Sequence, residues 1–153
     1  MKNRELFELI NKLDTLKNLS GAIFSYKIIS NKKSILNHYQ TYEEMIKPSE
    51  EYKQYDKQRI SLCDKYADVG DDGKVIINNN AYQITQFLSQ FNEELIVLNN
   101  ENLPILTEYA NQMRNGRDFL EQDAEVELKL INIEELPKDI NVEQMEVIMN
   151  FMN

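Results

Sequence analysis

Apolar side chains recur at three- and four-residue spacing through most of the chain, which is the spacing of one face of an α-helix. This pattern predicts helices over residues 4–16, about 22–46, 86–98 and about 104–122. A further helix is predicted to begin after Ser49, because Pro48 lacks an amide proton and the acids after Ser49 suit a first helical turn. We expect the helix over about 22–46 and the helix after Ser49 to pack antiparallel as a hairpin.

Short strands and turns separate the later helices. Residues 68–74 (Asp-Val-Gly-Asp-Asp-Gly-Lys) carry the strongest turn signal in the chain. The stretches 74–77 and 81–84 predict two strands, joined by three Asn residues that tolerate the left-handed backbone of a hairpin turn. Residues 125–130 alternate between charged and apolar side chains and predict an amphipathic strand.

The last helix is predicted to start at Asn141, because Gln144 follows three residues later and completes a capping box. Its apolar end, residues 147–152, is expected to cover the strand at 125–130. The elements together predict an α+β fold class: a long helical hairpin plus a small antiparallel β-sheet of about three strands, covered by further helices.

Charge is distributed unevenly along the 153 residues, which have the length of a single domain. Residues 1–66 carry 12 Lys and Arg against 9 acids, whereas residues 67–153 carry 5 against 17. We therefore predict one domain over 1–153, with a helical, tyrosine-rich portion at 1–67 and an acidic α+β portion at 68–153. The formal net charge of −9 disfavours direct nucleic-acid binding and fits a protein partner with a basic surface. An acidic surface that only maintains solubility is the alternative.

Several classes of protein are disfavoured by the residue inventory. The sequence lacks the run of about 20 apolar residues that a membrane helix needs, and its start lacks the apolar core of a signal peptide, so a cytoplasmic protein is expected. A single Cys and a single His argue against a disulfide framework and a Cys/His zinc site. We interpret His38 as a partly exposed surface residue and Cys63 as a semi-buried structural thiol. No enzyme activity, cofactor or metal is predicted.

The turn at 68–79 resembles a calcium loop only in part. With Gly73 at the sixth position of such a loop, Asp68 and Asp72 fall at ligand positions. Gly70 falls at another ligand position but has no side-chain oxygen. Asn79 falls at the twelfth position, where a bidentate Glu is needed. An acidic, solvent-exposed turn is the favoured interpretation.

Tyrosines and acidic residues are the candidates for partner binding. Tyr combines a large contact area with a polar tip and is enriched at interfaces. The same helical spacing also fits a semi-buried seam between helices, so both interpretations stay open. The partner-binding candidates are Tyr39, Tyr42, Tyr52, Tyr55, Arg59, Glu134, Glu135 and Asp139.

Six stretches between about residues 30 and 153 carry a family resemblance. They are Ile46-Lys-Pro-Ser-Glu-Glu-Tyr52, Arg59-Ile-Ser-Leu-Cys-Asp-Lys-Tyr-Ala67, Asp71-Asp-Gly-Lys74, Tyr82-Gln-Ile84, Glu125-Val-Glu-Leu128 and Glu134-Glu-Leu-Pro-Lys-Asp-Ile140. In this order they resemble a family of small, largely uncharacterised proteins encoded by tailed phages and prophages. The resemblance implies a phage origin and a small domain, and it brings no catalytic residues.

Charge and resemblance together lead to a functional hypothesis. The chain is expected to be a non-enzymatic, phage-encoded protein-interaction module that acts in the host cytoplasm as an acidic inhibitor of a host defence or nucleic-acid-processing protein. The alternative is a virion structural or assembly protein, such as an adaptor or scaffold-like subunit, which would self-associate or dock on a multimeric ring.

Overall fold

The computed structural model describes residues 1–152 and has an α+β architecture that divides into two compact units. Unit 1 comprises Met1–Ile46 and Arg114–Asn153, and unit 2 comprises Lys47–Met113. Unit 1 therefore joins the two ends of the chain, and neither unit corresponds to the basic or the acidic half of the sequence. The predicted α+β class is confirmed.

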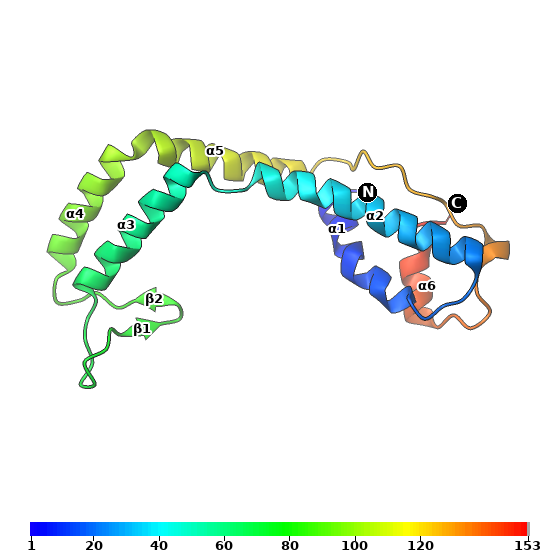
Figure 1. Cartoon of the computed structure of the whole chain (residues 1–153), viewed down its shortest axis with the longest axis horizontal. Coiled ribbons are helices and arrows are strands. Elements are labelled where there is room, and N and C mark those ends of the chain that lie inside the picture. The colour runs from blue at the N-terminus through cyan, green and yellow to red at the C-terminus, as the bar shows by residue number, and fades with distance from the viewer. Residues whose placement is uncertain (153) are drawn as a thin grey trace. The chain divides into compact units, whose positions relative to one another are not determined.

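Unit 1 is built around two packed helices, α1 (Asn3–Lys12) and α2 (Ala22–Met45), as labelled in Figure 1. A short 3₁₀ helix, η1 (Leu13–Leu16), extends α1, so the predicted helix over 4–16 is confirmed with a tighter last turn. The chain then turns at Gly21, whose φ of 128° favours glycine, and enters α2. The other elements are the end of α5 (Leu103–Leu120), η2 (Ile133–Glu135) and α6 (Val142–Met149).

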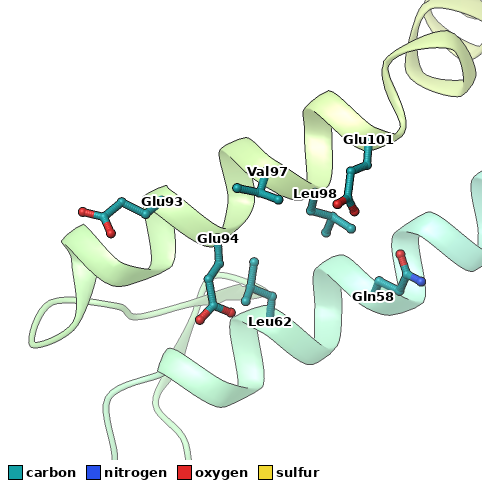
Figure 2. Close-up of a pocket in the computed structure, with 7 residues that line it drawn as sticks. All are labelled: Gln58, Leu62, Glu93, Glu94, Val97, Leu98 and Glu101. Atoms are coloured by element: carbon teal, nitrogen blue, oxygen red, sulfur yellow. The ribbon is translucent and has the colours of Figure 1, made fainter.

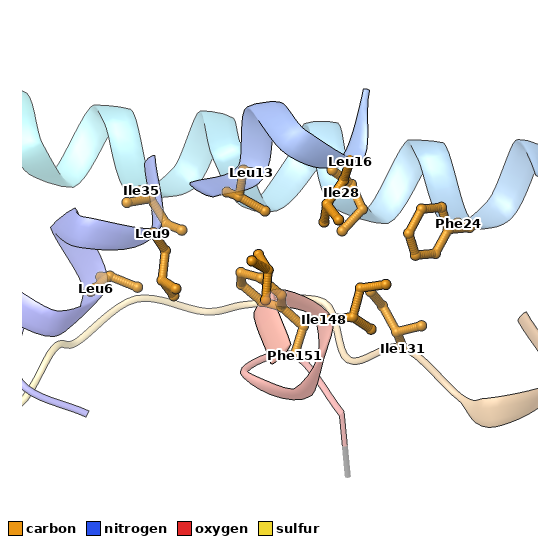
Figure 3. Packing of buried hydrophobic residues seen from close by; sticks show 11 residues of the cluster. Leu6, Leu9, Leu13, Leu16, Phe24, Ile28, Ile35, Ile131, Ile148 and Phe151 are labelled. Carbon is orange, nitrogen blue, oxygen red and sulfur yellow. The ribbon is translucent and has the colours of Figure 1, made fainter. Parts of the chain in front are cut away.

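The core of unit 1 lies between α1, α2 and α6 (Figure 3). Its buried residues are Leu6, Leu9, Leu13, Leu16, Phe24, Ile28, Ile35, Ile131, Val147, Ile148 and Phe151. The predicted capping box starts α6, since Gln144 N donates to Asn141 Oδ1 at 2.8 Å and Asn141 N donates to Gln144 Oε1 at 3.2 Å. The helix that begins at this cap carries Ile148, which is fully buried in the core. Burial of this apolar side chain away from water stabilises unit 1.

Unit 2 is a helical hairpin closed by a long connection. Helices α3 (Glu50–Tyr66) and α4 (Leu88–Glu101) lie side by side (Figure 1), and the first part of α5 follows α4. The predicted helix start is confirmed, because Ser49 Oγ accepts a hydrogen bond from Tyr52 N at 3.1 Å. Within unit 2, α3 packs on α4, and within unit 1 the helix over 22–46 packs on α1, so the two helices predicted to pair with each other belong to different units.

The sheet has two strands where about three were predicted. Strands β1 (Ile77–Asn78) and β2 (Ala81–Tyr82) pair antiparallel. The turn between them places Asn79 and Asn80 at φ values of 50° and 62°, which confirms the left-handed connection. The strand predicted at 125–130 was wrong: within the described residues this segment pairs with no strand, although Val126 and Leu128 pack against the core.

Candidate functional site

A groove of about 520 Å³ lies between α3 and α4 in unit 2. Figure 2 shows the apolar side chains of Leu62 and Leu98 between the two helices and Val97 on α4, with polar and acidic residues around them. The surrounding residues are Gln58, Glu93, Glu94 and Glu101. A surface with apolar side chains inside and carboxylates around them is suited to a partner that offers both apolar and basic groups.

The composition of α4 explains the groove. Every residue of α4 is exposed or half-buried. Val97, which lines the groove, is 55% exposed, and Leu88 at the start of the helix is also exposed. Residues 75–113 contain four Glu residues and neither Lys nor Arg. The helix therefore presents uncovered apolar surface next to negative charge, which is typical of interaction sites.

Only part of the negative charge around the groove is compensated. Lys65 Nζ lies 2.7 Å from Glu94 Oε1, and the Tyr66 hydroxyl donates to the same carboxylate at 2.5 Å. Lys65, followed by Tyr66, lowers the pKa of Glu94, and Glu94 raises the pKa of Lys65. Glu93 and Glu101 have no cationic partner among residues 1–152. These two carboxylates keep the outer side of α4 negative.

The partner-binding candidates that lie in unit 2, Tyr52, Tyr55 and Arg59, make contacts within that unit. Tyr55 is 6% exposed, and its hydroxyl donates to Asn99 Oδ1 at 2.8 Å. Tyr52 stacks on Tyr109 with ring centroids 3.7 Å apart, and burial raises the pKa of its phenol. Arg59 Nη2 pairs with Asp56 Oδ1 at 2.8 Å one helical turn earlier. These contacts favour the seam interpretation for Tyr52 and Tyr55, and a role of the set in binding stays a prediction.

The other predicted tyrosines belong to unit 1. Tyr39 and Tyr42 are half-buried and pack around Phe7, with ring centroids 5.0 and 5.8 Å from it. Edge-to-face and tilted contacts of this kind stabilise helix packing. The structure therefore brings Tyr39 to Tyr42 and Tyr52 to Tyr55, but it assigns the two pairs to different units.

The predicted acidic residues also divide into two kinds. Glu135 Oε2 lies 2.6 Å from Lys27 Nζ and accepts from Asn132 N at 2.9 Å. Lys27 chiefly lowers the pKa of Glu135, so this carboxylate ties η2 to α2. Glu134 and Asp139 are exposed and have no ion pair within residues 1–152. They are available to a partner, whereas Glu135 is engaged within the fold.

The predicted acidic turn is exposed at Asp71 and Asp72, and Asp68 is the exception. Its side chain is buried and accepts four hydrogen bonds: from Thr85 Oγ1 at 2.6 Å, Thr85 N at 3.0 Å, Gln86 N at 3.2 Å and Gln83 Nε2 at 3.1 Å. The hydroxyl of Thr85 contributes most to lowering the Asp68 pKa, to about 2. Because the donors lie 15 to 18 residues later in sequence, no local motif signals this arrangement.

His38 and Cys63 are the remaining candidates for chemistry. His38 is half-buried, which agrees with the predicted partial exposure; its Nε2 is hydrogen-bonded to Asn3 Oδ1 at 2.7 Å, and the ring lies against Phe7 and Phe119. Cys63 is a free thiol buried in α3, where a semi-buried thiol was predicted. Among residues 1–152, no group of three His, Cys, Asp or Glu side chains is arranged to hold a metal ion.

No known family model matches the chain, and no curated protein or solved structure shows significant similarity to it. The fold and the site describe an α+β protein of two compact units, with an acid-rimmed groove on the helical hairpin of unit 2. Within residues 1–152, no helix is long and apolar enough to span a membrane.

Proposed function

We propose that the chain is a non-enzymatic protein-interaction module, encoded by a tailed phage or prophage, that inhibits a host defence or nucleic-acid-processing protein in the host cytoplasm. The acid-rimmed groove between α3 and α4 is the observation that carries this proposal. The six stretches of sequence resemblance support the phage origin.

The groove fits a basic, amphipathic segment of a partner protein. Leu62, Val97 and Leu98 offer apolar surface that a partner's apolar side chain would desolvate. Glu93 and Glu101 then stand where Lys or Arg side chains on the edge of that segment would pair with them. Proteins that process nucleic acids carry basic surfaces for phosphate, and carboxylates placed on such a surface would compete with the nucleic acid.

Affinity capture of the tagged full chain from host lysate tests the proposal. We expect a nuclease, polymerase or defence protein to be recovered from uninfected cells. Val97→Ser should abolish this recovery, whereas the matched control Ile96→Ser, on an equally exposed neighbour outside the groove lining, should preserve it. Glu93→Gln with Glu101→Gln should weaken binding and flatten its salt dependence. Equal recovery by the Val97 and Ile96 variants would refute the groove as the binding site.

A virion structural or assembly role is the second candidate, and an apolar stripe on α2 favours it. Ile23, Tyr26 and Ile29 lie three residues apart and are each about 60% exposed or more. Such a stripe is suited to self-association or to docking on a multimeric ring. A stable homo-oligomer in light scattering that Ile29→Ser dissociates would support this role, as would recovery of phage head or tail proteins only after infection. A monomer would argue against it.

A further inference from the structure

Residues 124–130 form a strand-like segment without a strand partner. Isolated bridges bound it at both ends, Asp123 to Lys2 in antiparallel fashion and Ile131 to Met152 in parallel fashion. Its side chains alternate as in a strand, with Val126 and Leu128 packed on the core and Glu125 and Glu127 exposed. Within the described residues, Lys129 is the one position of 125–130 whose backbone groups are hydrogen-bonded.

The contact at Lys129 shows which edge of the segment is able to pair. The buried side chain of Asn31 on α2 donates from Nδ2 to Lys129 O at 2.9 Å, and its Oδ1 accepts from Lys129 N at 2.7 Å. These are the two bonds that a residue of a neighbouring strand would make. Because backbone groups of a strand alternate between its two edges, Glu127 and Glu125 direct theirs toward the same edge as Lys129.

A groove of about 530 Å³ lies along this edge, between the segment and α2, and belongs entirely to unit 1. The segment contributes Glu125, Glu127 and Lys129 to its lining. From α2, Ser34, Asn37 and Thr41 line the opposite wall at helical spacing, and each offers a hydroxyl or amide. The groove therefore has hydrogen-bonding groups on both long walls, as an extended peptide backbone requires.

Charge indicates the chemistry of the occupant. Glu125 and Glu127 form no ion pair within residues 1–152, and the Lys129 ammonium lies over the Tyr26 ring, 5.5 Å from its centroid. Residues that face each other across paired strands place their side chains on the same face. Lys or Arg side chains opposite the two glutamates would thus complement them.

We propose that this groove binds an extended segment of a protein partner, which adds as a strand to the edge at Glu125 and Glu127 and places basic side chains opposite them. Strand addition would supply the hydrogen bonds that the edge lacks, and the basic side chains would set the register. This inference concerns unit 1 and stands independently of the role proposed for the groove between α3 and α4.

The test is a titration of the full chain with an acetylated, amidated six-residue peptide in which Lys and Val alternate. Glu127→Pro removes both a backbone donor and a carboxylate from the pairing edge and should weaken binding about tenfold or more. The matched control Leu130→Pro removes a donor of the opposite register at an exposed position and should change binding less than about twofold. A peptide of alternating Glu and Val should bind at least about tenfold more weakly than the Lys peptide.

A second measurement keeps the test valid if either proline variant fails to fold. In the unaltered chain, the Lys peptide should slow amide hydrogen exchange at Glu125 and Glu127 and leave exchange at Leu130 unchanged. Binding that protects neither glutamate amide, equal binding of the two peptides, or no binding at millimolar peptide would overturn the proposal.

Discussion

The helices of the two units have the same spacing of apolar residues but differ in how far their apolar faces are buried. In unit 1, α1 and α2 bury their apolar faces in a core of 11 residues shared with α6. In unit 2, the buried residues are Tyr55, Leu62, Cys63, Ala67 and Asp68, and the apolar side chains of α4 remain largely uncovered. Periodicity thus predicted both helical regions equally well. It did not distinguish a face that the chain itself covers from a face left open to a partner.

The largest difference is expected from truncation of the core in unit 1. Phe151 is fully buried, so Phe151→Ala should lower the free energy of unfolding by about 3–5 kcal/mol. Val97→Ala on the open face of α4 should change it by less than about 0.5 kcal/mol. Urea denaturation followed by circular dichroism measures both. Similar losses for the two variants would show that unit 2 is packed as tightly as unit 1.

A smaller effect is expected at Gly116 in the unit 1 part of α5. A methyl group there would overlap Ile46 Cγ2 and lie 3.6 Å from Tyr42 Cε2. The overlap should cost about 1–3 kcal/mol, more than the roughly 1 kcal/mol that alanine gains by helix propensity. Gly116→Ala should therefore lower the midpoint of urea denaturation, and adding Ile46→Ala should recover part of the loss that Gly116→Ala causes. A raised midpoint for Gly116→Ala alone would contradict the close packing.

The smallest effect, confined to the long connection of unit 2, is expected from acid. The Asp68 pKa is about 2 in the folded protein and 3.8 ordinarily, so Asp68 stabilises the fold at and above pH 3.8. That contribution should be lost as pH falls from about 4 to about 2, because the protonated carboxyl no longer accepts all four hydrogen bonds. Amide exchange at Thr85 and Gln86 should accelerate over this window, and Asp68→Asn should remove the acid dependence. An unchanged acid response in this variant would assign it to another group.

The features that sequence predicted are local ones. Ser49 caps α3 through a hydrogen bond to Tyr52, three residues later, and Asn141 and Gln144 cap α6 across the same short span. Asn79 and Asn80 turn the β1–β2 hairpin because their own backbone tolerates positive φ. Hydrogen bonds and turns between residues no more than four apart depend little on the rest of the chain, so the sequence alone determined them.

Tertiary structure decided which faces meet. Lys27 and Glu135 are 108 residues apart, and Asp68 reaches donors up to 18 residues away. The pairing of α3 with α4, the division into two units and the unpaired edge at 124–130 are likewise features that no local motif in the sequence signals. The free energy of burial depends on the apolar area removed from water and is non-directional, so the sequence of a helix does not indicate which other helix will cover its apolar face. For this reason the sequence identified the helices, whereas the fold selected their partners and left both proposed binding grooves open.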